Sequence, residues 1–218
     1  MAKKGLSRLF FAKYQYDPVG GAKYTGGCET EKLASYSTEL ESNDDNDLYL
    51  NNGIAETEKG SFRSGTLTHT TGDLTNETSL LILGAKKHAP EIDGIEDDIE
   101  EIVYDDDIKP SELGVGLIEL HQVDGEEFHR AIVLARVLYN LPNDSANTKG
   151  ESVEWQTQEV SGKILRSEQN DDTYKHPWKF SADFSTEDNA IKYIKYKLNI
   201  TDPEKASLLV SSESKETN

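Results

Sequence analysis

The residues of this chain that could do chemistry are one cysteine, five histidines and many carboxylates, and their spacing favours no catalytic site. The histidines are scattered with no two at the spacing of metal ligands, and Cys28 has no second thiol for a disulfide or a redox pair. His121 and His129 flank a predicted turn and could approach each other across it. The sequence has no Gly-x-Ser-x-Gly elbow and no phosphate-binding glycine loop. We therefore expect no catalytic residue, no cofactor and no enzyme activity.

The densest charge lies at residues 89–107, which hold ten acids and no base. Hard cations take oxygen ligands, so Asp105, Asp106 and Asp107 could in principle hold calcium or magnesium. The segment lacks the fixed ligand spacing of a calcium loop, which favours a solvated acidic loop. Cation binding by residues 91–107 stays open at this stage.

Composition limits the class of protein. The chain has 218 residues, a formal charge of -18 and 35% hydrophobic residues, enough for one large β domain or two small ones. Tight nucleic-acid binding is not expected, because it depends on clustered Lys and Arg. No apolar run approaches membrane-spanning length, and the start of the chain does not form a cleaved signal, so we expect no membrane partner.

Two-residue alternation predicts that strands position most of the chain. Residues 30–41 have one modestly apolar face, which is typical of an exposed or partner-facing strand. The two longest apolar runs are separated by "VDGE" and predict an antiparallel hairpin whose second strand is covered on both sides. "VSG" at 160–162 predicts a second turn, pairing 151–159 with 163–167. The strands expected are 6–16, 30–41, 60–72, 113–122 and 126–140, with helices at 73–84 and 185–198.

We expect a single domain over residues 1–203, followed by a polar C-terminal tail at 204–218. Long polar segments between the predicted elements are interpreted as inserted loops or arms. These segments are 17–28, 42–59, 89–110 and 141–150.

The order of the segments resembles the major tail proteins of long-tailed phages (siphoviruses) that infect Gram-positive bacteria. The matching pieces are "GLSRLFFAKY", "LYLNNGIAETEKGSFRSGTLTHTTGDLTNETSLLILG", "GVGLIEL", "FHRAIVLARVLYNLPNDSANTKGESVEWQTQEVSGKI" and "WKFSADFSTEDNAIKYIKYKL". The resemblance runs over nearly the whole chain. It rests on the order and combination of the pieces, since none is a catalytic signature.

The resemblance implies a mainly β (α+β) fold, a tail-tube β-sandwich or barrel of antiparallel strands with a short flanking helix and long arms. It implies a structural virion protein whose homohexameric rings stack into the tail tube, the conduit for DNA ejection. The tape measure protein in the lumen, the tail terminator and the distal tail protein would be its partners. Assembly would take place in the host cytoplasm, and DNA would pass without sticking.

Candidate contact residues follow from the polar β segments. Leu33, Tyr36, Phe62 and Leu67 are candidates for the ring or stacking interface. The strand at 60–72 and its expected partner at 149–160 are long and polar, so they are predicted to approach the lumen, with Glu154 and Glu159 facing it. An acidic lumen would repel phosphates, although the charge could equally serve solubility.

A soluble β-sandwich binding module, of the carbohydrate-binding or adhesion type, is the alternative. Trp155 and Trp178 would then be stacking platforms for a sugar.

Overall fold

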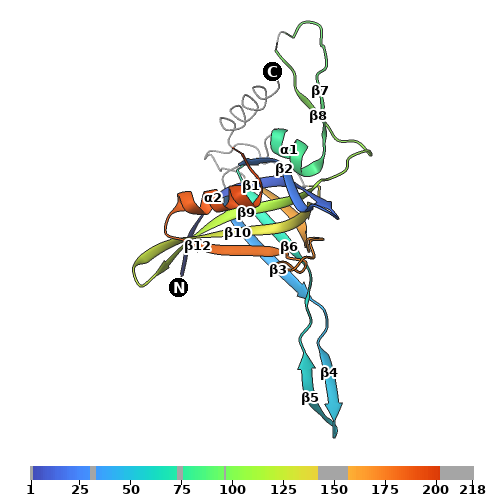
Figure 1. Cartoon of the computed structure of the whole chain (residues 1–218). Helices are drawn as coiled ribbons and strands as arrows, with labels where there is room; N and C mark the ends of the chain where they lie inside the picture. Colours follow the sequence, from blue (N-terminus) through green and yellow to red (C-terminus); the bar gives the residue numbers. More distant parts are fainter. Residues whose placement is uncertain (1, 30–32, 73–75, 96, 142–156, 202–218) are drawn as a thin grey trace, which may run out of the picture.

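The computed structural model describes residues 2–29, 33–72, 76–95, 97–141 and 157–201 and is mainly antiparallel β structure. Figure 1 shows a body of strands with one arm projecting from each of two opposite ends. The helices are α1 (Asn76–Leu83) and α2 (Glu187–Lys197). The strands are β1 (Ala2–Asp17), β2 (Gly21–Glu29), β3 (Leu33–Ser42), β4 (Asn46–Leu50), β5 (Gly53–Glu58), β6 (Phe62–Thr71), β7 (Lys86–His88), β8 (Glu101–Val103), β9 (Glu112–Val123), β10 (Glu126–Tyr139), β11 (Gln158–Leu165) and β12 (Lys179–Phe184).

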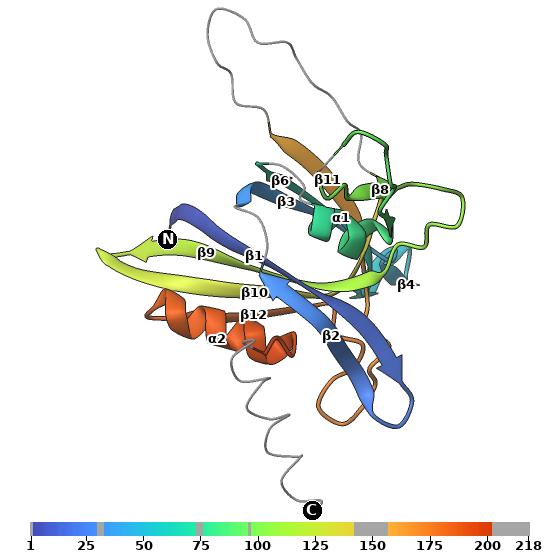
Figure 2. The same ribbon diagram turned by 90° about the horizontal axis from the view of Figure 1, so that it is seen from above.

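The main sheet has the order β2-β1-β9-β10-β11-β6-β3, and β12 also pairs with β10. The first part of β10, residues 129–134, pairs with β12, whereas residues 136–139 pair with β11. The β9–β10 register shifts between these parts, after Leu134. At this point the sheet divides into two packed layers, which Figure 2 shows from above. We call β2, β1, β9, β12 and the first part of β10 the helix-side layer, and β11, β6 and β3 the second layer.

One apolar core fills the space between the layers. Leu9 and Phe11 of β1 pack there with Leu67 of β6, and α1 adds Ile82 and Leu83. Residues one position along β1, Phe10 and Ala12, face the opposite way. The two-residue period of a strand thus gives β1 two apolar faces, each against a different partner.

A second core lies between the helix-side layer and α2. Ile194 and Leu198 are fully buried there. Close contact needs small residues on β9, since a Cβ added at Gly116 would lie 2.4 Å from Ile194 Cγ2. The Thr186 side chain caps the helix by accepting from the Asn189 backbone N–H.

The predicted central hairpin is confirmed. β9 and β10 are joined by Asp124 and Gly125, which both have positive φ, 49° and 91°. This is the conformation that a two-residue hairpin turn requires, and Asp-Gly favours it. The predicted strand at 60–72 is confirmed as β6. Leu33–Ser42 forms the predicted exposed strand, β3, whereas residues 30–32 lie outside the described part.

Three sequence interpretations were wrong. Residues 17–28 are not a loop, because Gly21–Glu29 form β2 and pair with β1. "VSG" is not a turn, because residues 158–165 are one strand, where Gly162 fits closely against Val137. His121 and His129 do not face each other, because His121 is opposite Phe128 and the two histidines have opposite phase in the hairpin.

The other predicted loops have partial secondary structure. Residues 42–59 contain the β4–β5 hairpin, and residues 89–110 contain β8, which pairs with β7. The loop at 141–150 lies almost entirely outside the described residues, as does the C-terminal tail at 204–218.

Candidate functional site

A continuous polar surface covers the outer side of the second layer. Three rows of directly paired residues cross its three strands, and none of the nine side chains is buried. The rows run Ser35–Thr70–Glu159, Ser37–Thr68–Ser161 and Glu39–Thr66–Lys163 from β3 through β6 to β11. We call these nine residues the polar face. It carries two carboxylates and one lysine, so hydroxyl groups dominate it.

The polar face ends at an open strand edge. β3 is the last strand of the main sheet, and its only backbone partner among the described residues is β6. Its middle and far end are largely exposed, with Leu40 51% accessible. An unpaired edge of this length can accept a strand from another chain.

A buried carboxylate links β3 to the other end of the sheet. Glu119 of β9 accepts hydrogen bonds from Lys3 of β1, from the Tyr36 hydroxyl of β3 and from His121 Nε2, the last at 2.7 Å. Burial by itself raises the pKa of Glu119, but these three bonds outweigh it and lower the pKa to about 2. The carboxylate therefore stays ionised and joins three strands by side chains.

Sequence reasoning missed this cluster, although a signal was present. Glu119 and His121 are in phase with Leu113, Val115 and Leu117, so they point into the core. Polar residues that continue an apolar phase must find partners inside the protein.

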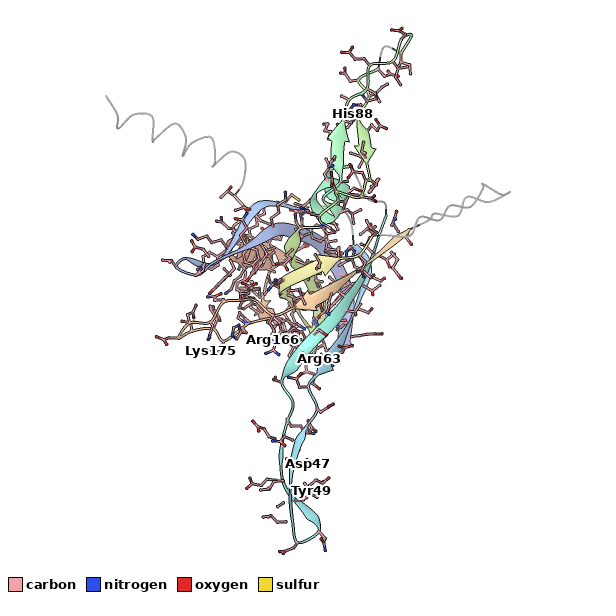
Figure 3. All side chains as sticks on the ribbon, turned by 90° about the vertical axis from the view of Figure 1, so that its right-hand side faces the viewer. Asp47, Tyr49, Arg63, His88, Arg166 and Lys175 are labelled. Carbon is pink, nitrogen blue, oxygen red and sulfur yellow. The ribbon has the colours of Figure 1, made fainter. Side chains whose placement is uncertain are left out.

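The first projecting arm is the β4–β5 hairpin, here called the hairpin arm (residues 46–58). It forms a separate two-stranded sheet with almost every residue exposed. Its tip nevertheless carries large apolar side chains, and Tyr49 lies opposite Ile54 with 64% and 57% of their surfaces accessible. Figure 3 shows Asp47 and Tyr49 far from the body.

The root of the hairpin arm is held by specific hydrogen bonds. The Asn43 N–H donates to the Ser61 carbonyl at 2.9 Å, and the Gly60 N–H donates to Asp45 Oδ1 at 3.0 Å. Gly60 has no room for a side chain, because a Cβ there would lie 1.7 Å from the Asn43 carbonyl oxygen. These contacts give the arm a defined direction where it leaves the body.

The second arm, residues 86–109, leaves the opposite end and includes His88, labelled in Figure 3. It is here called the acidic arm. Lys86 donates to Asp105 at 2.8 Å and to Asp107 at 3.3 Å, which lowers the pKa of Asp105. Within the described residues, no three His, Cys, Asp or Glu side chains are grouped so that they could hold a metal ion. The geometry therefore adds nothing to the idea of a cation site at 91–107.

The predicted contact residues lie in different places. Leu67 is fully buried and Leu33 nearly so, and both pack in the core between the layers. Tyr36 is half-buried and bonded to Glu119. Phe62 stacks on Trp178 with ring centroids 4.3 Å apart. The structure therefore brings Leu33, Tyr36 and Leu67 together inside the subunit rather than on its surface.

Glu159 is exposed on the polar face, and its predicted neighbourhood to residues 60–72 is confirmed by the pairing of β11 with β6. Glu154 and Trp155 lie outside the described residues. Trp178 has one ring face against Phe62, so that face is not free to stack on a sugar.

No protein-family model matches the sequence, and no curated protein matches it. None of the described helices is long and apolar enough to cross a membrane.

Proposed function

We propose that this chain is the subunit of a phage tail tube, in which six copies close into a ring and rings stack into a conduit for DNA. The polar face would line the lumen. The observation that carries the proposal is this face, three strands wide, which no described residue buries. It ends at a strand edge with no further backbone partner among the described residues, between two oppositely projecting arms. Such edges and arms are the features that extend contacts between copies.

The chemistry of the polar face suits a surface along which DNA slides. Phosphate binding gains its free energy from counterions released by Lys and Arg, and this face offers only Lys163. The two carboxylates, Glu39 and Glu159, oppose phosphate weakly. Most other acids of the described β segments lie elsewhere, many of them on the two arms, so slippage would depend on hydroxyl groups rather than on dense negative charge.

The arms would join successive rings, and the open β3 edge would meet a neighbour within a ring. A heterologous contact of this kind closes into a ring when the rotation from one copy to the next is a whole fraction of 360°, about 60° for six copies. The tape measure protein during assembly, and the terminator and distal tail proteins at the tube ends, would be the other partners. The protein would assemble in the host cytoplasm and remain in the virion.

The test is electron microscopy of the purified chain in negative stain over a range of protein concentrations. We expect rings or tubes with a central channel. A protein that remains monomeric at every concentration, by microscopy and by sedimentation, would contradict the proposal.

A charge-reversal variant tests the lumen assignment. Glu159→Lys adds a cation to the polar face and should leave tubes intact but slow DNA ejection from phage particles, because phosphates would be retained. Asp188→Lys, on α2 at the opposite side of the body, is the matched control and should leave ejection unchanged. Equal ejection from both variants would count against a lumenal polar face.

A further inference from the structure

A cavity of about 430 Å³ lies between β2, the loop before β12 and the C-terminal end of α2. Aromatic rings form part of its walls, at Tyr24, Tyr174, Phe180 and Tyr196, beside polar residues such as Gln169 and Asn199. Tyr196 is 80% exposed at the rim. A recess of this size with aromatic and polar walls can receive a protruding amphipathic side chain.

The charge of this cavity is opposite to that of the chain. Lys23 and Lys197 line it and no Asp or Glu does, although the chain has 41 acids among 218 residues. Outside the lining, Lys23 pairs with Asp17 at 3.6 Å. Lys197 Nζ lies 4.3 Å from the centre of the Phe180 ring and donates to the Tyr174 hydroxyl at 3.1 Å. The site is thus prepared for a partner that is aromatic or apolar and negatively charged.

Carboxylates also surround the cavity, and Asp171 and Asp172 are exposed on the adjacent loop. Glu168 pairs with Arg136 at 2.9 Å, and Asp171 accepts the backbone N–H groups of Thr173 and Tyr174, both at 2.8 Å. Arg166 and Lys175 are exposed on the same loop, and Figure 3 shows them at the end of the body from which the hairpin arm leaves. The surface around the cavity therefore carries both signs of charge, whereas the charged side chains of the lining itself, Lys23 and Lys197, are cations.

The tip of the hairpin arm has the complementary chemistry. Tyr49 and Ile54 form one exposed apolar pair, and Asp47 lies two residues along the strand on the same face of the hairpin. Because the arm extends well beyond the body (Figure 3), its tip would pass alongside the body of a neighbouring copy in a stack. Exposed apolar residues at the end of an ordered arm indicate a contact surface.

We propose that this cavity receives the tip of the hairpin arm of a second copy of the chain. Tyr49 would enter beside the aromatic rings, and Asp47 would lie near Lys23. This inference rests on the proposed function, because stacked rings bring the two surfaces together. It identifies the surface of one ring that would receive the arm of the next ring, and the residues that would meet there.

Disulfide trapping between two variants tests the proposal directly. In full-length protein carrying Cys28→Ser, a Tyr49→Cys variant is mixed with a Tyr196→Cys variant under assembling conditions and oxidised. A disulfide needs Cα atoms within about 7 Å, so a mixed dimer on a denaturing gel reports the predicted contact. Asn189→Cys is the matched control, exposed on α2 and about 10 Å from Tyr196 along the helix.

We expect at least a fivefold excess of mixed dimer with Tyr196→Cys over Asn189→Cys. Tubes that form while the two pairs cross-link equally, or not at all, would overturn this inference and leave the proposed function standing. Absence of rings and tubes in the Cys28→Ser parent and in the unmodified chain would instead contradict the proposed function, and this inference with it.

Exchanging the charges of the cavity and of the arm tip gives an independent test of this contact. Lys23→Glu and Asp47→Lys should each raise the protein concentration needed for half-assembly, roughly tenfold, and the double variant should recover most of the loss. A double variant that assembles worse than either single variant would contradict the pairing of these surfaces.

Discussion

The two layers of the sheet differ in what covers their outer sides. The helix-side layer is sealed by α2, and its packing is so close that Gly116 has no room for a methyl group. The second layer turns nine small or charged polar residues to solvent and has no helix over it in the described part of the chain. Both layers share one core, so the difference lies only in the outward phase of the strands. It indicates that the subunit is completed on one side and open to partners on the other.

The comparison is sharpest between two neighbouring residues of β6. Leu67→Ala removes a fully buried side chain and should lower the free energy of unfolding by about 3 kcal/mol, because it leaves a cavity between the layers. Thr66→Ala, on the polar face, should change it by less than about 0.5 kcal/mol. Urea denaturation of the two variants measures both values. Similar losses at both positions would mean that the second layer is covered on its outer side as well.

The helix-covered side can be tested by adding a single methyl group. Gly116→Ala should destabilise the protein by about 2 kcal/mol, because the new Cβ would overlap Ile194 and push α2 away from the sheet. Gly72→Ala is the control, since a Cβ there would meet nothing within 4 Å. Thermal unfolding followed by circular dichroism compares the two, and a neutral Gly116→Ala variant would show that α2 packs loosely.

The core shared by the layers should make stability depend on pH. Burial lowers the pKa of His69 from 6.5 to about 4, so the folded protein keeps the ring neutral while the unfolded chain gains a proton below pH 6.5. The stability is fully present above pH 6.5 and is lost as the pH falls, by slightly less than 2 kcal/mol between pH 7 and pH 5.

His69→Gln is the matched variant, because an amide can still bond the Tyr139 hydroxyl, which lies 3.1 Å from His69 Nε2. Urea denaturation at pH 7 and pH 5 should show a smaller loss in the variant by about that amount. An unchanged pH dependence would mean that other groups, such as the carboxylates on the arms, dominate it.

Local signals allowed part of this fold to be predicted from the sequence. The Asp124-Gly125 turn and the Thr186 cap depend only on residues close in the sequence. The central hairpin and α2 could therefore be predicted from local sequence alone. β2 was missed because glycines interrupt its alternation, and its stability comes from pairing with β1. Gly162 was misread as a turn for a similar reason, since it fits a close contact with Val137 that the sequence does not reveal.

The polar face was predicted only in part. Its Thr-rich and Gln-rich strands were recognised, and Glu159 lies on it, yet Leu67 belongs to the opposite phase of β6 and points into the core. A one-residue change of phase moves a side chain to the other face, and alternation alone does not say which face is inward. The arms were anticipated as polar segments, but the cavity depends on three segments far apart in the chain.

The shared strand β10 has a consequence for how the protein unfolds. Its first part bonds to β12 and its last part to β11, while β9 lies along most of its length. One continuous strand thus belongs to both layers, and opening either layer leaves part of β10 unpaired on one side. The body should therefore lose its structure in one cooperative step, with the amide hydrogens of β10 among the last to exchange with solvent.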